Sequence, residues 1–226
     1  MRIPALLAST LLALPAALAA QVPTSDAPAG PRVGILVGLS SATLSGSDVT
    51  ITAGDVGVTK KRRTGGVAGV YATLPLAGSP VSLRPELLYA QKGVSLSADG
   101  VMGTTKLDYL ELPVLLQLDV PNTSGFRPAL YVGPSVAYRV KCSLDVSGGG
   151  QSTSSGCDNS GSAGQPAPRK FDVSGVVGGQ LGFELGGQSL GVGVRYTQGF
   201  TNFAKDVDAK NRTFSVYGAV DFPFGR

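Results

Sequence analysis

The feature that most constrains the fold is an alternation of apolar and polar residues that recurs in eight separate runs along the chain. In the run LRPELLYAQKG, Leu83, Leu87 and Tyr89 occupy one set of alternate positions, and Arg84 and Glu86 occupy the other. Successive side chains of a strand point to opposite faces, so this run has one apolar face and one charged face. Period two sustained in all eight runs predicts strands and argues against helices.

The lengths of the runs and of the segments between them favour a barrel that crosses a membrane. A tilted strand needs roughly 9–11 residues to cross the hydrocarbon core, and the runs meet that need. Short turns alternate with longer connections, which is typical of outer-membrane barrels, whereas a soluble lipocalin-like barrel has eight strands without requiring this asymmetry. The runs are residues 32–41, 67–76, 83–93, 106–118, 128–140, 171–185, 189–200 and 213–224. The longer connections are residues 42–65, 97–103, 142–169 and 201–211.

The width of an eight-stranded lumen decides which face of each run points inward. Such a lumen is barely wide enough for side chains, so rows of Leu, Val and Phe are too bulky for it. The mixed rows of Gly, Ser, Thr, Tyr and charged residues fit better, and the apolar rows then face lipid. We predict an all-β fold, an eight-stranded antiparallel up-and-down transmembrane β-barrel, over residues 32–226. The charged side chains that this fold turns inward are Arg84, Glu86, Lys92, Glu111, Arg139, Asp172, Glu184, Arg195 and Asp221.

The N-terminus has the features of a secretory signal peptide. Arg2 precedes a Leu- and Ala-rich core, and a small-x-small cleavage site ends at Ala19. Residues 1–20 are therefore expected to be removed on export, and residues 21–31, rich in Pro and Ala, to form a tether. No later segment has the 18 uninterrupted apolar residues of a membrane helix.

Several segments together resemble the porin-family outer-membrane β-barrel domain, a family that includes PorT-like proteins and is common in Bacteroidota. They are RPELLYAQKG, KLDYLELPVLLQL, LYVGPSVAY, FDVSGVVGG, VRYTQGF and VYGAVDFPF. The resemblance spans nearly the whole chain that follows the signal peptide. It implies an eight-stranded barrel in the outer membrane of a Gram-negative cell, and it implies little about activity.

The residue inventory argues against an enzyme. The chain has no histidine, which removes the commonest general base, the Ser-His-Asp arrangement and most metal sites. We therefore expect no catalytic residue, no metal and no cofactor. The inward charges are interpreted as salt bridges that close the lumen, because buried charges are retained when they are paired. A selectivity filter or a catalytic carboxylate pair is the alternative.

Cys142 and Cys157, in a chain exported to an oxidising compartment, are predicted to form one disulfide.

The sequence says less about the molecules that the protein binds. The first long connection contains four consecutive basic residues, Lys60, Lys61, Arg62 and Arg63. They are either a solvated loop segment or a binding site for lipopolysaccharide phosphates or for an acidic extracellular partner. The net charge of +4 is too mild to indicate nucleic acid. We expect a monomer in outer-membrane lipid. Two functions remain open: a structural or interaction protein that acts through its long loops, and a narrow pore for ions or small solutes.

Overall fold

The computed structural model describes residues 30–45, 59–98, 101–120, 126–156, 169–185, 187–202 and 209–224. The predicted signal peptide and most of the predicted tether lie outside these residues, as does Cys157. Within the described part of the chain, no helix has the length and apolar character needed to cross a membrane.

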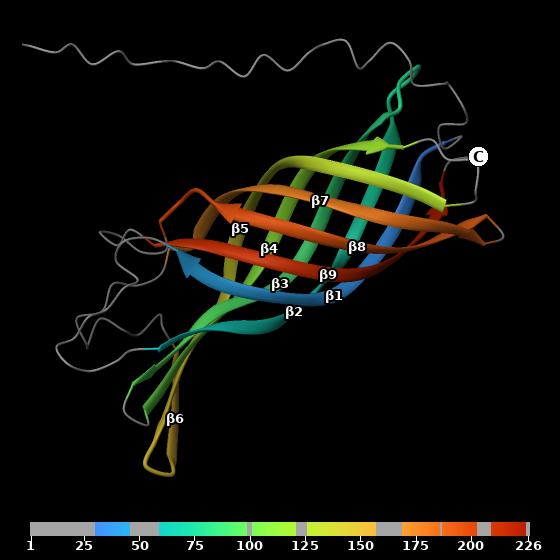
Figure 1. The fold of residues 1–226 in the computed structure, drawn as a ribbon. Coiled ribbons are helices and arrows are strands. Elements are labelled where there is room, and N and C mark those ends of the chain that lie inside the picture. Colours follow the sequence, from blue (N-terminus) through green and yellow to red (C-terminus); the bar gives the residue numbers. More distant parts are fainter. Residues whose placement is uncertain are drawn as a thin grey trace, which may run out of the picture.

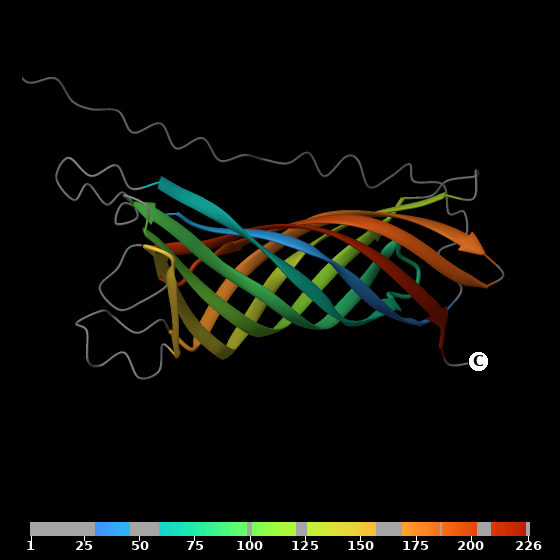
Figure 2. The same cartoon turned by 90° about the horizontal axis from the view of Figure 1, so that it is seen from below.

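The described residues form nine β-strands that pair only antiparallel. The pairing order is β4-β3-β2-β1-β9-β8-β7-β5, and a further pairing between β4 and β5 closes the ring. The strand β6 pairs with β5 outside this ring, so the barrel itself has eight strands, as predicted (Figures 1 and 2). The bounds are β1 Arg32–Ser45, β2 Thr59–Pro75, β3 Val81–Ala98, β4 Val101–Asp119, β5 Phe126–Gly148, β6 Gln151–Gly156, β7 Phe171–Leu185, β8 Gln188–Gly199 and β9 Lys210–Pro223.

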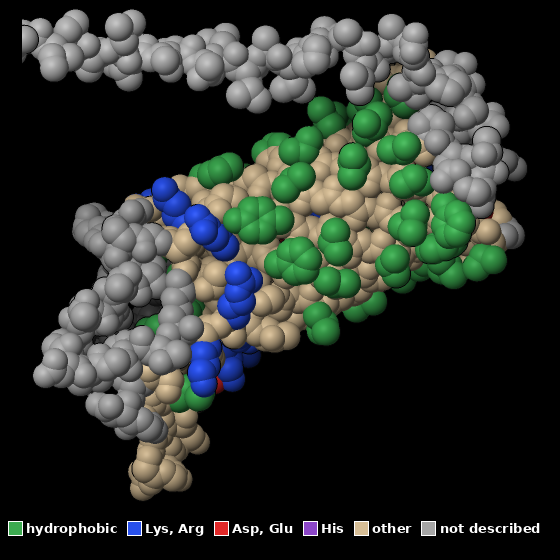
Figure 3. Space-filling model, viewed as in Figure 1, with side chains coloured by type: hydrophobic (Ala, Val, Ile, Leu, Met, Phe, Trp, Pro, Cys, Tyr) green, Lys and Arg blue, Asp and Glu red, His purple; other side chains and the backbone are tan. Residues whose placement is uncertain are grey.

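The two faces of the wall follow the predicted parity. On β1, Ile35, Val37 and Leu39 are each more than half exposed on the outside, while Leu36 is buried inside. The same alternation holds along β8 and β9. Hydrophobic side chains therefore cover the outer wall, as Figure 3 shows for one face of the barrel. A wall of this kind faces hydrocarbon, and a closed ring leaves no unpaired sheet edge inside the bilayer.

The two ends of the barrel differ. At one end, β2 joins β3 and β7 joins β8 through short connections; we call this the turn end. The start of β1 and the end of β9 also lie there, because Arg32 pairs with Pro223. We call the opposite end the loop end. In outer-membrane barrels the short turns face the periplasm and the longer loops face outward.

Strand pairing continues beyond the barrel at the loop end. The register runs from Lys61 of β2 through Ser95, Thr104 and Asp145 to Ser154 of β6, so five strands form one sheet there. We call this extension the projecting sheet; it comprises residues 59–62, 94–98, 101–105, 144–148 and 151–156. Figure 1 shows the hairpins β3–β4 and β5–β6 reaching past the ends of β1 and β9.

The projecting sheet corrects the prediction that residues 60–63 lie in a loop. Residues 60–63 belong to β2, where the backbones of Lys60 and Arg62 pair with Leu96 and Val94 of β3. Much of the connections predicted at residues 42–65 and 142–169 is also strand. Lys61 and Arg62 occupy opposite faces of β2 and are both exposed, so this part of the strand lacks the apolar row by which a strand is recognised in a sequence.

Candidate functional site

The centre of the lumen is closed by an ion cluster that joins opposite walls of the barrel. Arg84 and Glu86 lie two residues apart on β3 and so share its inner face, and Arg195 lies on β8, four strands away around the ring. Arg84 Nε donates to Glu86 Oε1 at 2.8 Å. Arg195 Nη2 lies 2.8 Å from Oε1 and 2.7 Å from Oε2 of the same carboxylate. No side chain of the three is more than 5% exposed, so one anion holds two cations out of contact with water.

Three tyrosine rings surround the two guanidinium groups. Arg84 Cζ lies 4.0 Å from the ring centroid of Tyr71 and 5.2 Å from that of Tyr131. Arg195 Cζ lies 5.3 Å from Tyr131 and 5.5 Å from Tyr217. Such contacts place cations on the negative faces of the rings, which offsets part of the excess positive charge of the cluster. The hydroxyls of Tyr131 and Tyr217 are 2.8 Å apart and share a hydrogen bond.

A second layer of charges lies nearer the loop end. Lys92 Nζ is 2.5 Å from Glu111 Oε1, and it lies over the ring of Tyr109. Asp172 accepts hydrogen bonds from Asn211 Nδ2, at 2.8 Å, and from the hydroxyl of Thr201. Arg139 is also buried in the interior. Eight of the nine predicted inward charges are thus buried, and each layer combines both signs.

The ninth predicted charge, Glu184, is corrected by the structure. Its side chain is 51% exposed and forms an ion pair with Arg127 at the turn end. Its parity is inward, but it lies close to the end of β7, where the wall no longer encloses it. Two further cations at the turn end were not predicted. Arg127 pairs with Glu184, and Arg32 pairs with Asp221. Arg32 shares its parity with the inward residues of the first run, so the alternation could have identified it.

Solvent-exposed groups gather at the loop end. All six residues of β6 are exposed, and their partners on β5 cover only one edge of the strand. Asp145 of β5 is bonded to the ammonium of Lys106 and to the hydroxyl of Ser154, and these contacts lower the pKa of its carboxyl group. The exposed Lys and Arg among the described residues all lie at this end: Lys61, Arg62, Lys106, Lys141, Arg169, Lys170 and Arg212.

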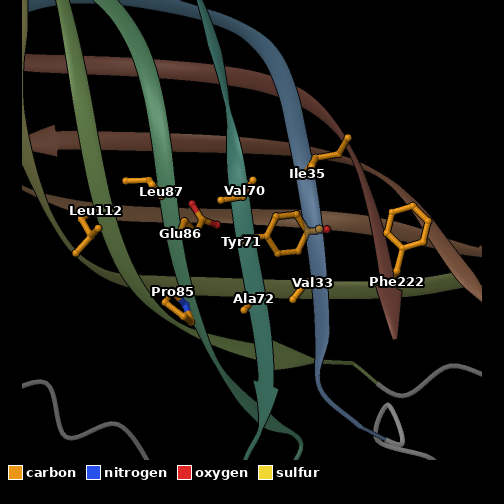
Figure 4. Close-up of a pocket in the computed structure, with 11 residues that line it drawn as sticks. Val33, Ile35, Val70, Tyr71, Ala72, Pro85, Glu86, Leu87, Leu112 and Phe222 are labelled. Atoms are coloured by element: carbon orange, nitrogen blue, oxygen red, sulfur yellow. The ribbon is translucent and has the colours of Figure 1, made fainter. Parts of the chain in front are cut away.

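The lipid-facing wall is hollowed near the turn end. A groove of about 530 Å³ lies across β1 to β4 and reaches Phe222 of β9 (Figure 4). Its outer lining is apolar and includes Val33, Ile35, Val70 and Leu87. This position on a membrane wall suits the acyl chains of the surrounding bilayer. Among the described residues, no group of acidic, Cys or His side chains is arranged to hold a metal ion.

A comparison with protein-family models agrees with this architecture. A family model described as "Outer membrane protein beta-barrel domain" matches residues 19–205. Among curated proteins, none matches the sequence.

Three solved structures are similar to this chain. Neisserial surface protein A is 15% identical with a TM-score of 0.47, over 85% of this chain and 97% of its own. OprG from Pseudomonas aeruginosa is 14% identical with a TM-score of 0.46, over 87% and 97%. Ail of Yersinia pestis, solved with the heparin analogue sucrose octasulfate, is 12% identical with a TM-score of 0.39, over 85% and 99%.

Proposed function

The chain belongs to the outer-membrane β-barrel family, and from that premise we propose that it is a non-enzymatic interaction protein that displays the projecting sheet outside the cell on a closed barrel. One observation carries the proposal. The strands β2 to β5 continue past the barrel, and β6, whose residues are all exposed, forms the edge of the sheet that they build. An exposed strand edge offers backbone donors and acceptors to an extended segment of another protein.

The composition of β6 supports this role. Its sequence, QSTSSG, contains no Lys and no Pro, which are residues that commonly block a free edge. It also contains no apolar side chain that would favour aggregation. The edge is therefore open to backbone pairing and well solvated in the absence of a partner.

The lumen supports a closed barrel rather than the alternative of a narrow pore. Arg84, Glu86 and Arg195 fill the middle of the interior from opposite walls, with Tyr71, Tyr131 and Tyr217 packed around them. A solute that crossed would have to break these buried ion pairs, and breaking a buried pair costs several kcal/mol.

The absence of enzymatic activity is part of the proposal. The sequence has no histidine to serve as a general base. Among the described residues, the most deeply buried carboxylate is that of Glu86, and it is already bonded to two guanidinium groups. The PorT-like relationship, the cleavage of residues 1–20 and the monomeric state stay predictions.

The proposal is tested by trimming the β5–β6 hairpin. Residues 145–154 are replaced by Asn-Gly, a sequence that favours a tight hairpin turn between Leu144 and Ser155. Extended peptides are selected from a display library on the wild-type protein in nanodiscs and then measured on the trimmed variant. Peptides that bind the wild type and not the variant are expected, with heat resistance of the barrel unchanged in both. Failure to select any peptide that depends on the hairpin would contradict the interaction role.

The closed lumen is tested separately in planar lipid bilayers. The purified wild-type protein is expected to give no steady conductance. A large and steady conductance would show that the pore is the correct function.

A further inference from the structure

We propose that a cleft on the outer wall between β5 and β7 binds a phosphate group of the glycolipid that forms the outer leaflet. The cleft has a volume of about 230 Å³. It is lined by Tyr138, Arg139, Val140, Lys141 and Lys170.

The cleft forms where two paired strands separate. The register between β5 and β7 ends at the pair Tyr138 and Phe171. One step further, the backbone N–H of Arg139 donates to the carbonyl of Lys170 at 2.7 Å. Beyond this bond β5 continues to Gly148, whereas β7 has not yet begun. Lys141 and Lys170 therefore lie on the two arms of the fork, and both are exposed.

A β-bulge turns Lys141 toward the cleft. Between β4 and β5 the register steps from Tyr109 and Arg139 to Asp108 and Lys141, so Val140 is an extra residue on β5. Inward and outward positions exchange at such a bulge, and bulges often re-aim a side chain. Arg139 is buried in the lumen, and without the extra residue Lys141 would point the same way. With it, Lys141 is outside and Cys142 is inside.

The cleft lies at the level of the lipid headgroups. Directly on its turn-end side, the rings of Tyr138 and Phe171 contact each other at a tilt, with centroids 5.0 Å apart, and both are exposed on the outer wall. Aromatic residues of membrane proteins gather at the boundary between hydrocarbon and headgroups. Val136 and Val173 continue the apolar wall below them. A lipid whose acyl chains lie on this wall would place its headgroup at Lys141 and Lys170.

The two ammonium groups are available for an anion. No salt bridge within the described part of the chain includes Lys141 or Lys170. Lys106 lies at the same end but is paired with Asp145. Phosphate oxygens form strong charge-assisted hydrogen bonds to such cations.

The location selects a lipid as the occupant and selects its leaflet. The cleft opens beside an aromatic pair on the lipid-facing wall, which suits an amphiphile better than a free ion. It lies at the loop end, where Lys and Arg gather along the margin of the hydrophobic wall (Figure 3). The loop end of outer-membrane barrels is the extracellular one, so the lipid is that of the outer leaflet.

The test compares binding of lipid A to two double variants. The mature protein is placed in phosphatidylcholine nanodiscs, and bound bisphosphorylated lipid A is counted by native mass spectrometry. Lys141→Gln with Lys170→Gln is expected to weaken binding about tenfold or more, the loss of one or two charged hydrogen bonds. The control Lys61→Gln with Arg62→Gln removes the same charge at the same end and should leave binding within about twofold. All four side chains are exposed, so both variants are expected to fold. Heat resistance of each variant checks this.

Two further ligands separate the possible sources of phosphate. Dephosphorylated lipid A is expected to bind the wild-type protein no more tightly than bisphosphorylated lipid A binds the Lys141/Lys170 variant. Excess inorganic phosphate is expected not to displace lipid A. Equal binding of lipid A to wild type and variant, an equal loss in the control, or full displacement by inorganic phosphate would each overturn the proposal.

Discussion

Arg195 and Glu86 meet across the full width of the barrel. They lie on β8 and β3, which stand on opposite sides of the ring, and Arg195 Nη2 is within 2.8 Å of both oxygens of the Glu86 carboxylate. Arg84 binds the same carboxylate from its own strand. The two cations thus depend on one anion, and the consequences of removing each partner differ.

Glu86→Gln is expected to be the most destabilising single charge removal in the barrel. It leaves two buried guanidinium groups without their shared anion, and breaking a buried pair in this way costs about 3–5 kcal/mol. Arg195→Met should cost less, because Glu86 remains bonded to Arg84. The free energy of unfolding in urea, followed by the gel shift of folded against unfolded protein in lipid vesicles, measures both.

Glu184→Gln is the matched control. It removes the same charge from a half-exposed pair at the rim, where the expected cost is at most about 1 kcal/mol. Equal stabilities of Glu86→Gln and Glu184→Gln would mean that water reaches the central cluster and that the lumen is not closed.

The parts of this site that could be predicted from sequence are those that depend on parity alone. Alternation placed Arg84, Glu86 and Arg195 inside, because period two is maintained along their strands. The meeting of β3 and β8 is a consequence of ring closure, which no single run encodes. Lys141 could not be assigned, because the bulge at Val140 exchanges inside and outside without a local sequence signal. Residues 60–63 were assigned to a loop because a strand with two solvated faces has no apolar row.

Cys142 and Cys157 are predicted to be bonded to each other. Cys142 is buried near the loop end of β5, and the segment up to Cys157 contains the β5–β6 hairpin, which would hold the two ends of the segment close together. Unreduced mature protein should take up no alkylating reagent, as measured by mass, and should take up two equivalents after reduction. Reduction is expected to raise protease cleavage in the loop-end segments while heat resistance of the barrel is retained. Alkylation without reduction would contradict the pairing.

The β5–β6 hairpin is expected to loosen in acid. The ammonium of Lys106 and the hydroxyl of Ser154 lower the pKa of Asp145, so the ionised carboxylate stabilises the hairpin. For a lowered pKa, this stabilisation is present above the pKa of the unfolded state and is lost as the pH falls through the folded value. The amide NMR signal of Ser154 should shift with that transition, and Asp145→Asn should remove the shift. An unchanged titration in Asp145→Asn would assign the transition to another group.

Tyrosine rings packed over cross-strand glycines should limit substitution inside the barrel. Tyr217 lies directly opposite Gly193, and a Cβ at Gly193 would overlap its ring. The same relationship joins Tyr131 to Gly178 and Tyr71 to Gly34, so the three rings of the central cluster each use the space above a glycine. Gly193→Ala should therefore displace Tyr217 from Arg195 and cost about 1–3 kcal/mol, as overpacked interiors do.

A matched glycine tests whether the ring, rather than the strand backbone, sets this cost. Gly103 lies on β4 in the projecting sheet, and a Cβ there would meet nothing within 4 Å. Gly103→Ala is expected to leave the free energy of unfolding unchanged or slightly higher. Combining Gly193→Ala with Tyr217→Leu should cost less than the sum of the two single changes, because the shorter side chain vacates the space that the new methyl group needs. Additive costs in that double-mutant cycle would mean that the glycine is required for the backbone of β8 and not for the position of the tyrosine ring.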